Sequence, residues 1–412
     1  MQKKSFHQRW FTCTPVDFSG GPEFFTRDSG LLCRSFQTLG MDSLAVMAGP
    51  ARKNDGPDLI RAKLLHLTSS DWWKQHQLDG VVLYAWGMPK FLPIAHAIHR
   101  AGIKLVLNQD SVGIVSPLNG IPDWVAERNA RLGPCPQGFK YFPRAIRIAL
   151  EGLYQLAVVD PFRLLHLLQG DVVACVSPGA VERFRRYCRG LAPFGLPGRV
   201  HLVPHPVNPI FHYDGSTSKT PRIVAIGRWD DHLQKRPDVM MHIAERLLTK
   251  EQSVEIDIVG NVTPQLANWH QGLERAIAAR IHLTGRLEPE DLAQQMRAAQ
   301  IIYCSSAHES FHIASGEGLC SGCSVVSSKA PSLASFDWFT SRNSGTLAEK
   351  NSPEDHLVAL ELELRNWREG LRNPDSISQY WIKHLHGPNV ARQILRLFSD
   401  LPISDTNEPL GF

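Results

Sequence analysis

The stretch between residues 301 and 326 restricts the fold of this chain more than any other segment. A short apolar run opens it, Glu309 follows, and a second carboxylate, Glu317, comes eight residues later. Gly322 then precedes another short apolar run. This order indicates a βαβ unit, in which a buried strand is followed by a loop, a helix closed by glycine and a second buried strand. The segment therefore predicts a parallel sheet and a helix N-terminus, where N–H groups suit a phosphate and the carboxylates suit sugar hydroxyls.

The order of residues around the two glutamates resembles the Glu-x7-Glu signature of glycosyltransferase family 4. Members of that family are nucleotide-sugar enzymes with the GT-B fold. Six positions of the signature are kept here, namely Glu309, Phe311, Glu317, Gly322, Val325 and Val326. The resemblance implies that Glu309 holds hydroxyls of the donor sugar and that Glu317 binds the ribose.

Three positions of the same stretch depart from the family pattern. Ser310 and His312 stand where the family commonly has glycine, and Ser324 stands where it has proline. His312 places a side chain where bare backbone usually meets the donor phosphate. That imidazole either obstructs the phosphate or adds a hydrogen-bond donor to it.

Length and charge limit the class of protein. A chain of 412 residues exceeds one compact core, so two domains are expected. The formal net charge of +4 is too small to indicate nucleic acid as a partner. The eight cysteines are mostly scattered, which favours a reducing compartment, and the pair Cys320 and Cys323 is expected to pack at a helix end. Neither a signal peptide nor a membrane span is evident, so we expect a cytoplasmic protein, with contact to the inner face of the membrane as one alternative.

The first part of the chain alternates apolar runs with helical patterns. After a strand at 10–14, Gly20 and Gly21 break the pattern before a helix at 24–39. These glycines form either a loop facing phosphate or acceptor, as the resemblance implies, or a tight connection from strand to helix. Further β-like runs occur at 44–47, 64–67, 81–84, 103–107 and 172–176. Their alternation with helices predicts a parallel sheet covered on both sides.

Two polar residues, Gln109 and Asp110, follow the run that ends at Leu107. Enzymes of the resembled family often present a histidine there, facing the donor sugar. Gln109 has no acid or base function but hydrogen-bonds a hydroxyl, and Asp110 supplies a charge. The other interpretation is a polar cap at a strand end.

The segment 114–138 is rich in proline and glycine and is interpreted as a long loop on the acceptor side. Arginines interleaved with aromatic residues follow at 139–147 and again at 182–189. Such stretches either dock on an anionic membrane or a lipid-linked acceptor, or form solvated helix faces.

A polar segment rich in glycine and proline at 214–221 is interpreted as a linker. The expected domains are an acceptor-side Rossmann-like domain over 1–214, completed by about 376–412, and a donor-binding Rossmann-like domain over 215–375. The resemblance implies that the two domains face each other across a cleft and that a C-terminal helix crosses back to the first.

The second domain opens with an apolar strand that ends in Gly227 and Arg228, and Lys235 follows seven residues later. A departing diphosphate needs cations, and the family uses such an Arg and Lys pair. Arg236 stands where the family has glycine. Gly260 closes the next strand and matches the family's turn beside the nucleotide base.

The resemblance implies a retaining, metal-independent glycosyltransferase that moves a sugar from a nucleotide diphosphate to a hydroxyl of a glycan, a lipid-linked molecule or a small molecule. No cofactor and no metal are expected. The alternatives are a nucleotide-sugar epimerase of the same fold and a non-catalytic sugar-nucleotide binder. The expected catalytic residues are Arg228, Lys235 and Glu309. The expected donor-binding residues are Gly227, Gly260, Phe311, His312, Ile313 and Glu317, and those on the acceptor side are Gly20, Gly21, Gln109 and Asp110.

Overall fold

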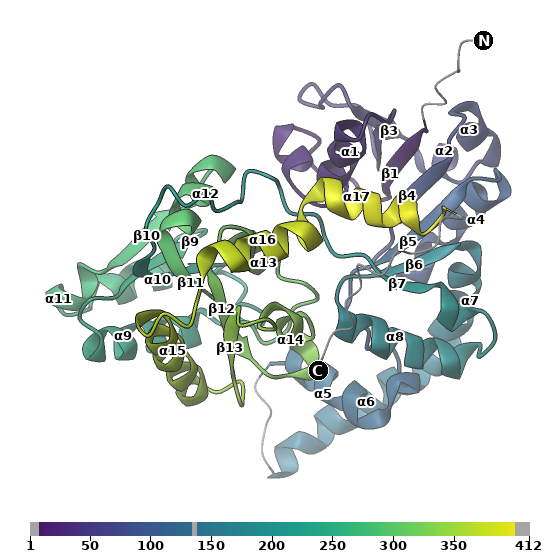
Figure 1. Cartoon of the computed structure of the whole chain (residues 1–412). Helices are drawn as coiled ribbons and strands as arrows, with labels where there is room; N and C mark the ends of the chain where they lie inside the picture. The colour runs from purple at the N-terminus through teal and green to yellow at the C-terminus, as the bar shows by residue number, and fades with distance from the viewer. Residues whose placement is uncertain (1–7, 134–137, 400–412) are drawn as a thin grey trace.

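Two parallel β-sheets, each covered by helices, organise the chain (Figure 1). A computed structural model describes residues 8–133 and 138–399. The first sheet has seven strands in the order β3-β2-β1-β4-β5-β6-β7, and the second has six in the order β10-β9-β8-β11-β12-β13. Neighbouring strands within both sheets run parallel. This arrangement confirms the expectation of two Rossmann-like domains.

The strands of the first sheet are short and apolar because helices bury both of their faces. Every residue of β1 and β4 is buried. The strands are β1 (Trp10–Thr14), β2 (Ala45–Ala48), β3 (Leu59–Ala62), β4 (Gly80–Tyr84), β5 (Lys104–Gln109), β6 (Val172–Cys175) and β7 (Val200–Leu202).

Helices of the first domain cover that sheet and extend beyond it. The α-helices are α1 (Asp28–Thr38), α2 (Leu64–Leu67), α3 (Ser70–Gln75), α4 (Leu92–Arg100), α5 (Ile121–Arg131), α6 (Phe142–Tyr154), α7 (Asp160–Gln169) and α8 (Pro178–Leu191). The shorter turns are η1 (Pro22–Thr26), η2 (Pro89–Phe91), η3 (Pro117–Asn119), η4 (Gly138–Tyr141), the π-helical η5 (Gln155–Val159) and η6 (Leu196–Arg199).

Two expectations for the first domain are wrong. The run 64–67 is the helix α2, and the strand beside β2 is β3, five residues earlier. Leu64 and Leu65 are exposed there, so their apolarity does not mark a buried strand. The segment 114–138 is not one long loop, because it contains η3 and α5. Trp124 of α5 is buried, and this packing favours a helix despite the flanking glycines.

The second sheet lies between α-helices in the same way. Its strands are β8 (Thr220–Ile226), β9 (Glu255–Val259), β10 (Ile281–Gly285), β11 (Ala299–Tyr303), β12 (Ser324–Ser328) and β13 (Gly345–Ala348). Its helices are α9 (Pro237–Lys250), α10 (Pro264–Gln271), α11 (Arg275–Ala278), α12 (Pro289–Ala298), α13 (Ile313–Cys320), η7 (Pro331–Leu333), α14 (Ser335–Phe339) and α15 (Pro353–Arg368). Cys320 and Cys323 are buried free thiols at the end of α13.

The last two helices cross from the second domain to the first (Figure 1). Helix α16 (Pro374–Leu385) contacts α13, and α17 (Gly387–Arg396) packs on α1. Val390 and Ile394 share a buried cluster with Trp10 of β1. This crossing confirms the expected return of the C-terminal helix.

Two glycines bring the ends of β8 and β9 together. Gly260 has a φ of +127°, and a Cβ added to it would lie 2.0 Å from the carbonyl oxygen of Gly227. That separation is far below van der Waals contact, so a side chain at position 260 would push the two strand ends apart. Bare backbone is therefore required where the sheet meets the candidate donor site.

We expect Gly260→Ala to lower the free energy of unfolding by about 3 kcal/mol, because it combines a disfavoured φ with a backbone clash. Gly102→Ala is the matched control, since Gly102 also has a positive φ (+76°) but nothing within 4 Å of its added Cβ. The control should cost about 1 kcal/mol. Urea unfolding of both variants measures the difference, and equal losses would contradict the proposed clash.

Candidate active site

A buried ion pair joins two loops at the carboxyl edge of the second sheet. Lys235 lies just before α9, and its Nζ is 2.5 Å from Oε1 of Glu309 in the loop between β11 and α13. The hydroxyl of Ser306 donates to the same carboxylate oxygen at 2.7 Å. Burial alone would raise the pKa of Glu309, but Lys235 and Ser306 together help to hold that pKa below its usual value. Two of the three predicted catalytic residues, Lys235 and Glu309, are therefore in contact, and the carboxylate of Glu309 is ionised.

His312 lies directly beside this pair, at the N-terminus of α13. Its Nδ1 is 2.7 Å from the hydroxyl of Ser315, and its ring is buried. Burial, together with the nearby Lys235, lowers the pKa of His312 to about 4, so the imidazole is neutral at neutral pH. A neutral ring adds no positive charge for a phosphate, although it still offers a polar nitrogen.

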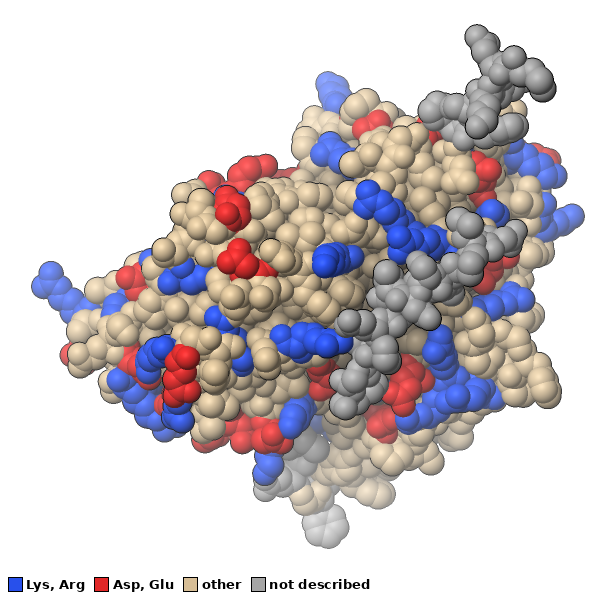
Figure 2. Space-filling model, viewed as in Figure 1, with Lys and Arg blue, Asp and Glu red and all other residues tan. Residues whose placement is uncertain are grey.

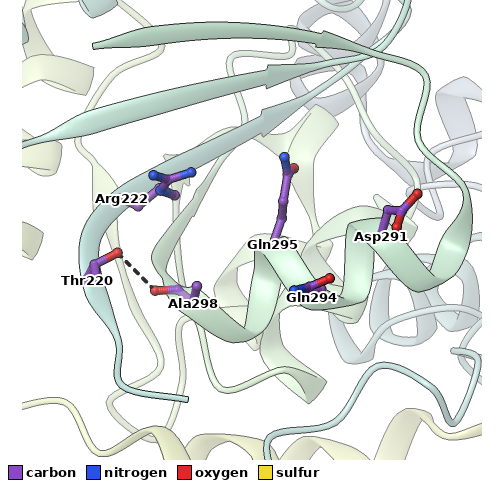
Figure 3. A pocket seen from close by; sticks show the side chains of 6 residues that line it. All are labelled: Thr220, Arg222, Asp291, Gln294, Gln295 and Ala298. Carbon is purple, nitrogen blue, oxygen red and sulfur yellow. Dashed lines mark hydrogen bonds between the residues drawn. The ribbon is translucent and has the colours of Figure 1, made fainter.

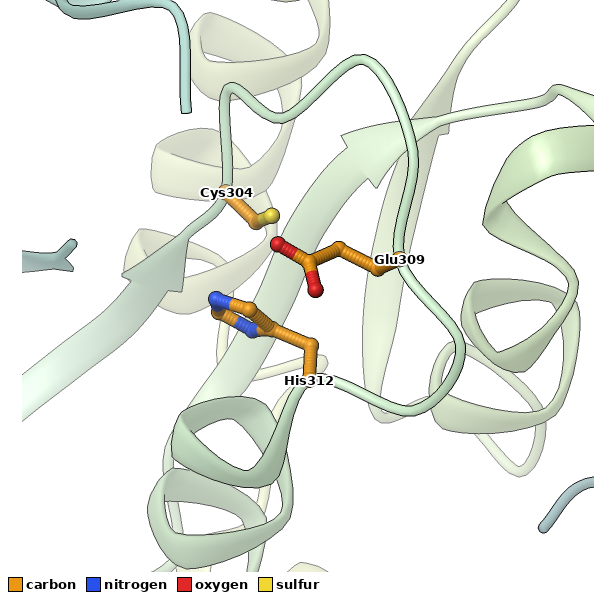
Figure 4. Close-up of side chains that lie close together, drawn as sticks. All are labelled: Cys304, Glu309 and His312. Carbon is orange, nitrogen blue, oxygen red and sulfur yellow. The ribbon is translucent and has the colours of Figure 1, made fainter. Parts of the chain in front are cut away.

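Cys304, Glu309 and His312 lie close enough together to hold a metal ion (Figure 4). One ligand atom of each falls within 4.8 Å of the others, and all three residues are buried. An ion there would compete with Lys235 for the carboxylate of Glu309, because that ammonium already contacts it. Burial raises the pKa of the Cys304 thiol to about 11, so the thiol is protonated at neutral pH. In this structure the carboxylate of Glu309 is already paired with Lys235.

Two residues that replace family glycines keep a left-handed backbone. Arg236 has φ and ψ of 50° and 60°, and His312 has 62° and 77°. This conformation costs an ordinary side chain about 1–2 kcal/mol. Arg236 gains a compensating contact, because its Nη1 donates to Oδ1 of Asn351 at 2.5 Å. The backbone shape that glycine allows is thus retained while side chains are added.

Glu317 sits inside α13 as an isolated buried carboxyl group. Its Oε2 has no hydrogen-bond partner within the described chain. Burial raises the pKa of Glu317, and Arg27 at the start of α1 opposes that shift. A buried oxygen without a partner is costly unless a ligand supplies one. Glu317 is therefore suited to accept a hydrogen bond from a bound hydroxyl.

The other two predicted residues of this sheet edge, Gly227 and Arg228, follow β8. The side chain of Arg228 is 70% exposed, and its Nη2 donates to Oε1 of Gln234 at 3.1 Å. Arg228 does not contact Glu309, so the structure brings Lys235 but not Arg228 to the carboxylate. Gln234 in turn donates to the carbonyl of His308 at 3.2 Å, which ties the loop after β8 to the loop after β11.

A second charged cluster lies where the two domains meet. His205, in the segment after β7, is buried with Nε2 3.1 Å from Oδ1 of Asp110 and Nδ1 3.3 Å from Oδ1 of Asp28. Although burial opposes protonation, the two carboxylates raise the pKa of His205 to about 9. Burial alone would raise the pKa of Asp110, but that pKa is lowered chiefly by His205, with a smaller contribution from Ser310 of the second domain. The charged imidazole of His205 lies beside Phe311, with ring centroids 5.5 Å apart, so this cluster is at the contact between the domains.

Gln109 ends β5 and is fully buried. Neither its Oε1 nor its Nε2 has a partner within the described residues. The amide packs against Gly87, where an added Cβ would lie 2.6 Å from Oε1. Both unpaired atoms are consistent with the predicted contact to a sugar hydroxyl.

The remaining predicted residues pack mainly against other parts of the chain. Phe311 is 1% exposed and packs edge-on against Phe339, with ring centroids 5.1 Å apart, and Ile313 is the first residue of α13. Gly20 leaves no room for a Cβ, which would lie 2.3 Å from Oδ1 of Asp55. The neighbouring Gly21 caps η1 with φ of −71°. The glycine loop thus resembles a tight connection more than a phosphate cradle.

A surface hollow of about 440 Å³ lies away from this chemistry (Figure 3). It is formed between the start of β8 and helix α12, at the opposite end of the sheet from Glu309. Its lining residues are Thr220, Arg222, Asp291, Gln294, Gln295 and Ala298. None of them belongs to the predicted site, so the hollow does not define the donor site.

Sequence reasoning missed His205, Asp28, Arg27 and Ser306. His205 lies between Pro204 and Pro206, outside any helix or strand, and no sequence signal joins it to Asp110. Ser306 was detectable in principle, since a hydroxyl three residues before a buried carboxylate is within reach of it.

The raised pKa of His205 predicts a pH dependence of stability. Stabilisation by the protonated ring is complete below the unfolded pKa near 6.5 and is lost as the pH rises through about 9. In wild type this amounts to about 3 kcal/mol at most. We therefore expect the unfolding free energy of His205→Gln to fall less than that of wild type between pH 6.5 and 9. Exposed His99→Gln serves as the control, and parallel curves for wild type and His205→Gln would contradict the assignment.

The left-handed backbone at His312 predicts an unusual order of stability. His312→Gly and His312→Ala remove the same ring contacts, but only glycine relieves the backbone. The glycine variant should be more stable than the alanine variant by about 1 kcal/mol. Denaturant unfolding of the two variants measures this, and a more stable alanine variant would show that the backbone relaxes instead.

Comparison with known proteins agrees with this geometry. Residues 220–365 match the family described as Glycosyl transferases group 1. The MMP alpha-(1->4)-mannosyltransferase of Mycolicibacterium hassiacum is 28% identical over 137 residues, or 33% of this chain, and the match spans about a third (33%) of that relative's length.

Solved structures extend the likeness to both domains. HepE of Anabaena in complex with UDP superposes with a TM-score of 0.62 at 13% identity, over 96% of this chain and 100% of that one. The lipopolysaccharide outer core galactosyltransferase WaaB gives 0.59 at 14% identity, over 96% and 100%. The chain therefore has the GT-B fold, and its second domain matches the glycosyl transferases group 1 family over residues 220–365.

Proposed function

We propose that this protein is a retaining glycosyltransferase that moves a sugar from a nucleotide diphosphate to a hydroxyl acceptor. The observation that carries the proposal is the buried pair of Lys235 and Glu309 beside the N-terminus of α13. An ionised carboxylate suits donor-sugar hydroxyls, and an ammonium with a helix N-terminus suits a diphosphate. HepE, which shares the fold, is described with UDP and with UDP-glucose, and this supports a nucleotide-sugar donor.

Each residue of the site has a distinct role in this proposal. The ammonium of Lys235 stabilises the negative charge that grows on the diphosphate as the sugar bond breaks. Arg228 is exposed and free to turn toward the same phosphate, since its two hydrogen bonds are to residues of its own loop. Glu309 holds sugar hydroxyls, and the unpaired oxygen of Glu317 accepts from the ribose. The departing diphosphate takes the acceptor proton, so no strong protein base is needed.

The acceptor side of the site is formed by the first domain. Gln109 offers an unpaired amide, and Asp110 holds His205 in its charged form. A charged imidazole at this place compensates for the histidine that the family commonly presents after the fifth strand. We infer that the acceptor is a glycan, a lipid-linked molecule or a small molecule whose hydroxyl is placed by these groups.

The first test is binding. Thermal unfolding is measured with UDP, GDP, ADP and their sugar conjugates, in the presence of EDTA. One nucleotide series should raise the melting temperature, because a ligand at 100 times its Kd stabilises the native state by about 2.7 kcal/mol. A shift that depends on added metal would contradict metal independence, and no shift with any nucleotide would contradict the donor site.

Glu309→Gln tests the role of the carboxylate. Transfer to an acceptor should fall by at least about 100-fold, because the neutral amide is a weaker acceptor and leaves Lys235 without its partner. The shift caused by the nucleotide diphosphate alone should persist. Exposed Glu349→Gln is the matched control. Unchanged transfer by the Glu309 variant would remove that residue from the site, and donor binding without transfer by wild type would favour a non-catalytic binder.

A further inference from the structure

The helical segment 142–169 of the first domain exposes apolar side chains and buries several polar ones. It comprises α6, the π-helical η5 and α7 without a break. Of its fifteen exposed residues, Arg147 is the only charged one. The others include Phe142, Leu150, Leu153 and Phe162, which are 55–67% exposed. Soluble proteins rarely expose so continuous an apolar surface, so this face is suited to a partner that is itself apolar.

The polar residues of the same segment point inward. Asp160 and Arg163 of α7 are buried and form an ion pair at 2.8 Å. The hydroxyl of Tyr187 on α8 donates to Asp160 at 2.9 Å, and Ser116 donates to its other oxygen at 2.5 Å. Both carboxylate oxygens of Asp160 are therefore paired inside the domain, which fixes the buried side of α7 and leaves the apolar side chains outside. The helical run is held firmly with its apolar side outward.

The stretch of chain that carries this apolar face has an excess of positive charge. Residues 138–199 contain nine Lys and Arg against four Asp and Glu, an excess of five that is larger than the net charge of +4 of the whole chain. Arg147, Arg185 and Arg189 are exposed, and Phe194 beyond them is 94% exposed. Figure 2 shows an area of tan at the lower right of the molecule with a group of Lys and Arg beside it, next to a smaller group of Asp and Glu. Apolar side chains bordered by arginines suit a surface of apolar chains bordered by anions.

We propose that the α6–α7 face docks on an anionic lipid membrane. The exposed apolar side chains enter the boundary between headgroups and acyl chains, and the arginines bind the phosphates above it. A second copy of this chain is the less favourable occupant, because a two-fold interface would bring the two positive rims together. Among the described residues, no helix is long and apolar enough to cross a bilayer, so the contact is with one leaflet.

The docking face is also joined to the second domain. Arg183 of α8 donates to the carbonyl of Pro331 at 2.7 Å, in the turn that follows β12. Helix α5, which precedes the segment, contacts the same turn. Membrane binding would therefore hold the first domain at a fixed orientation beside the donor domain. The inference goes beyond the proposed transfer reaction and does not depend on it.

Sedimentation with lipid vesicles tests the proposal on the full chain without nucleotide or acceptor. Wild type should sediment with vesicles that contain phosphatidylglycerol and bind pure phosphatidylcholine at least about tenfold more weakly. Leu150→Gln/Leu153→Gln/Phe162→Gln should bind the anionic vesicles at least about tenfold more weakly than wild type. Arg147→Gln/Arg189→Gln should weaken binding and reduce its dependence on salt.

Leu64→Gln/Leu65→Gln is the matched control, since these two side chains are 63% and 77% exposed on α2, outside the docking face. This variant should bind as wild type does. All replaced residues are exposed, so thermal unfolding should be little changed in each variant. Absence of binding, equal binding by the triple variant, or equal binding to both lipids would overturn the proposal. If light scattering shows a dimer for wild type and a monomer for the triple variant, the face binds a second copy of the chain instead.

Discussion

The contact between Lys235 and Glu309 is the interaction on which the candidate site depends. Both side chains are nearly buried, and a buried charge without a partner is expensive, so each residue requires the other. Their loops follow β8 and β11, which are neighbours in the sheet. Backbone contacts reinforce the pair, since Ala307 donates to the carbonyl of Gln234 at 2.8 Å. A charged site can therefore exist at this edge without bound ligand, because the charge is already balanced.

Backbone shape, more than side-chain identity, connects this site to the family pattern. His312 and Arg236 occupy glycine positions yet keep the left-handed conformation that glycine adopts freely. Both loops thus carry a side chain at a position where the backbone has a conformation that glycine adopts most easily. Arg236 uses its side chain to bind Asn351, and His312 places a neutral ring over Glu309.

Most of the fold could be predicted from the sequence because parallel sheets have short apolar strands separated by helices. The strand 10–14 has the predicted bounds, and the predicted run 172–176 corresponds to β6. Local pattern failed at 64–67, where four residues fit a strand and a helix turn equally well. It also failed for His205, whose partners Asp28 and Asp110 are distant in sequence and are joined only by packing. For residues 139–147 the sequence left a docking surface and a solvated helix face open, because the pattern alone does not show which side chains of α6 are exposed.

The two connections between the domains lie side by side. The chain crosses first near Val207 and returns near His386, and these residues form a β-bridge. Val207 donates to the carbonyl of Leu385 at 2.7 Å, and Gly387 donates to that of Val207 at 2.9 Å. The two crossings therefore form one connection rather than two independent linkers. A change in the relative position of the domains about this connection would break cross-domain contacts such as Arg183 with Pro331 and leave both sheets intact.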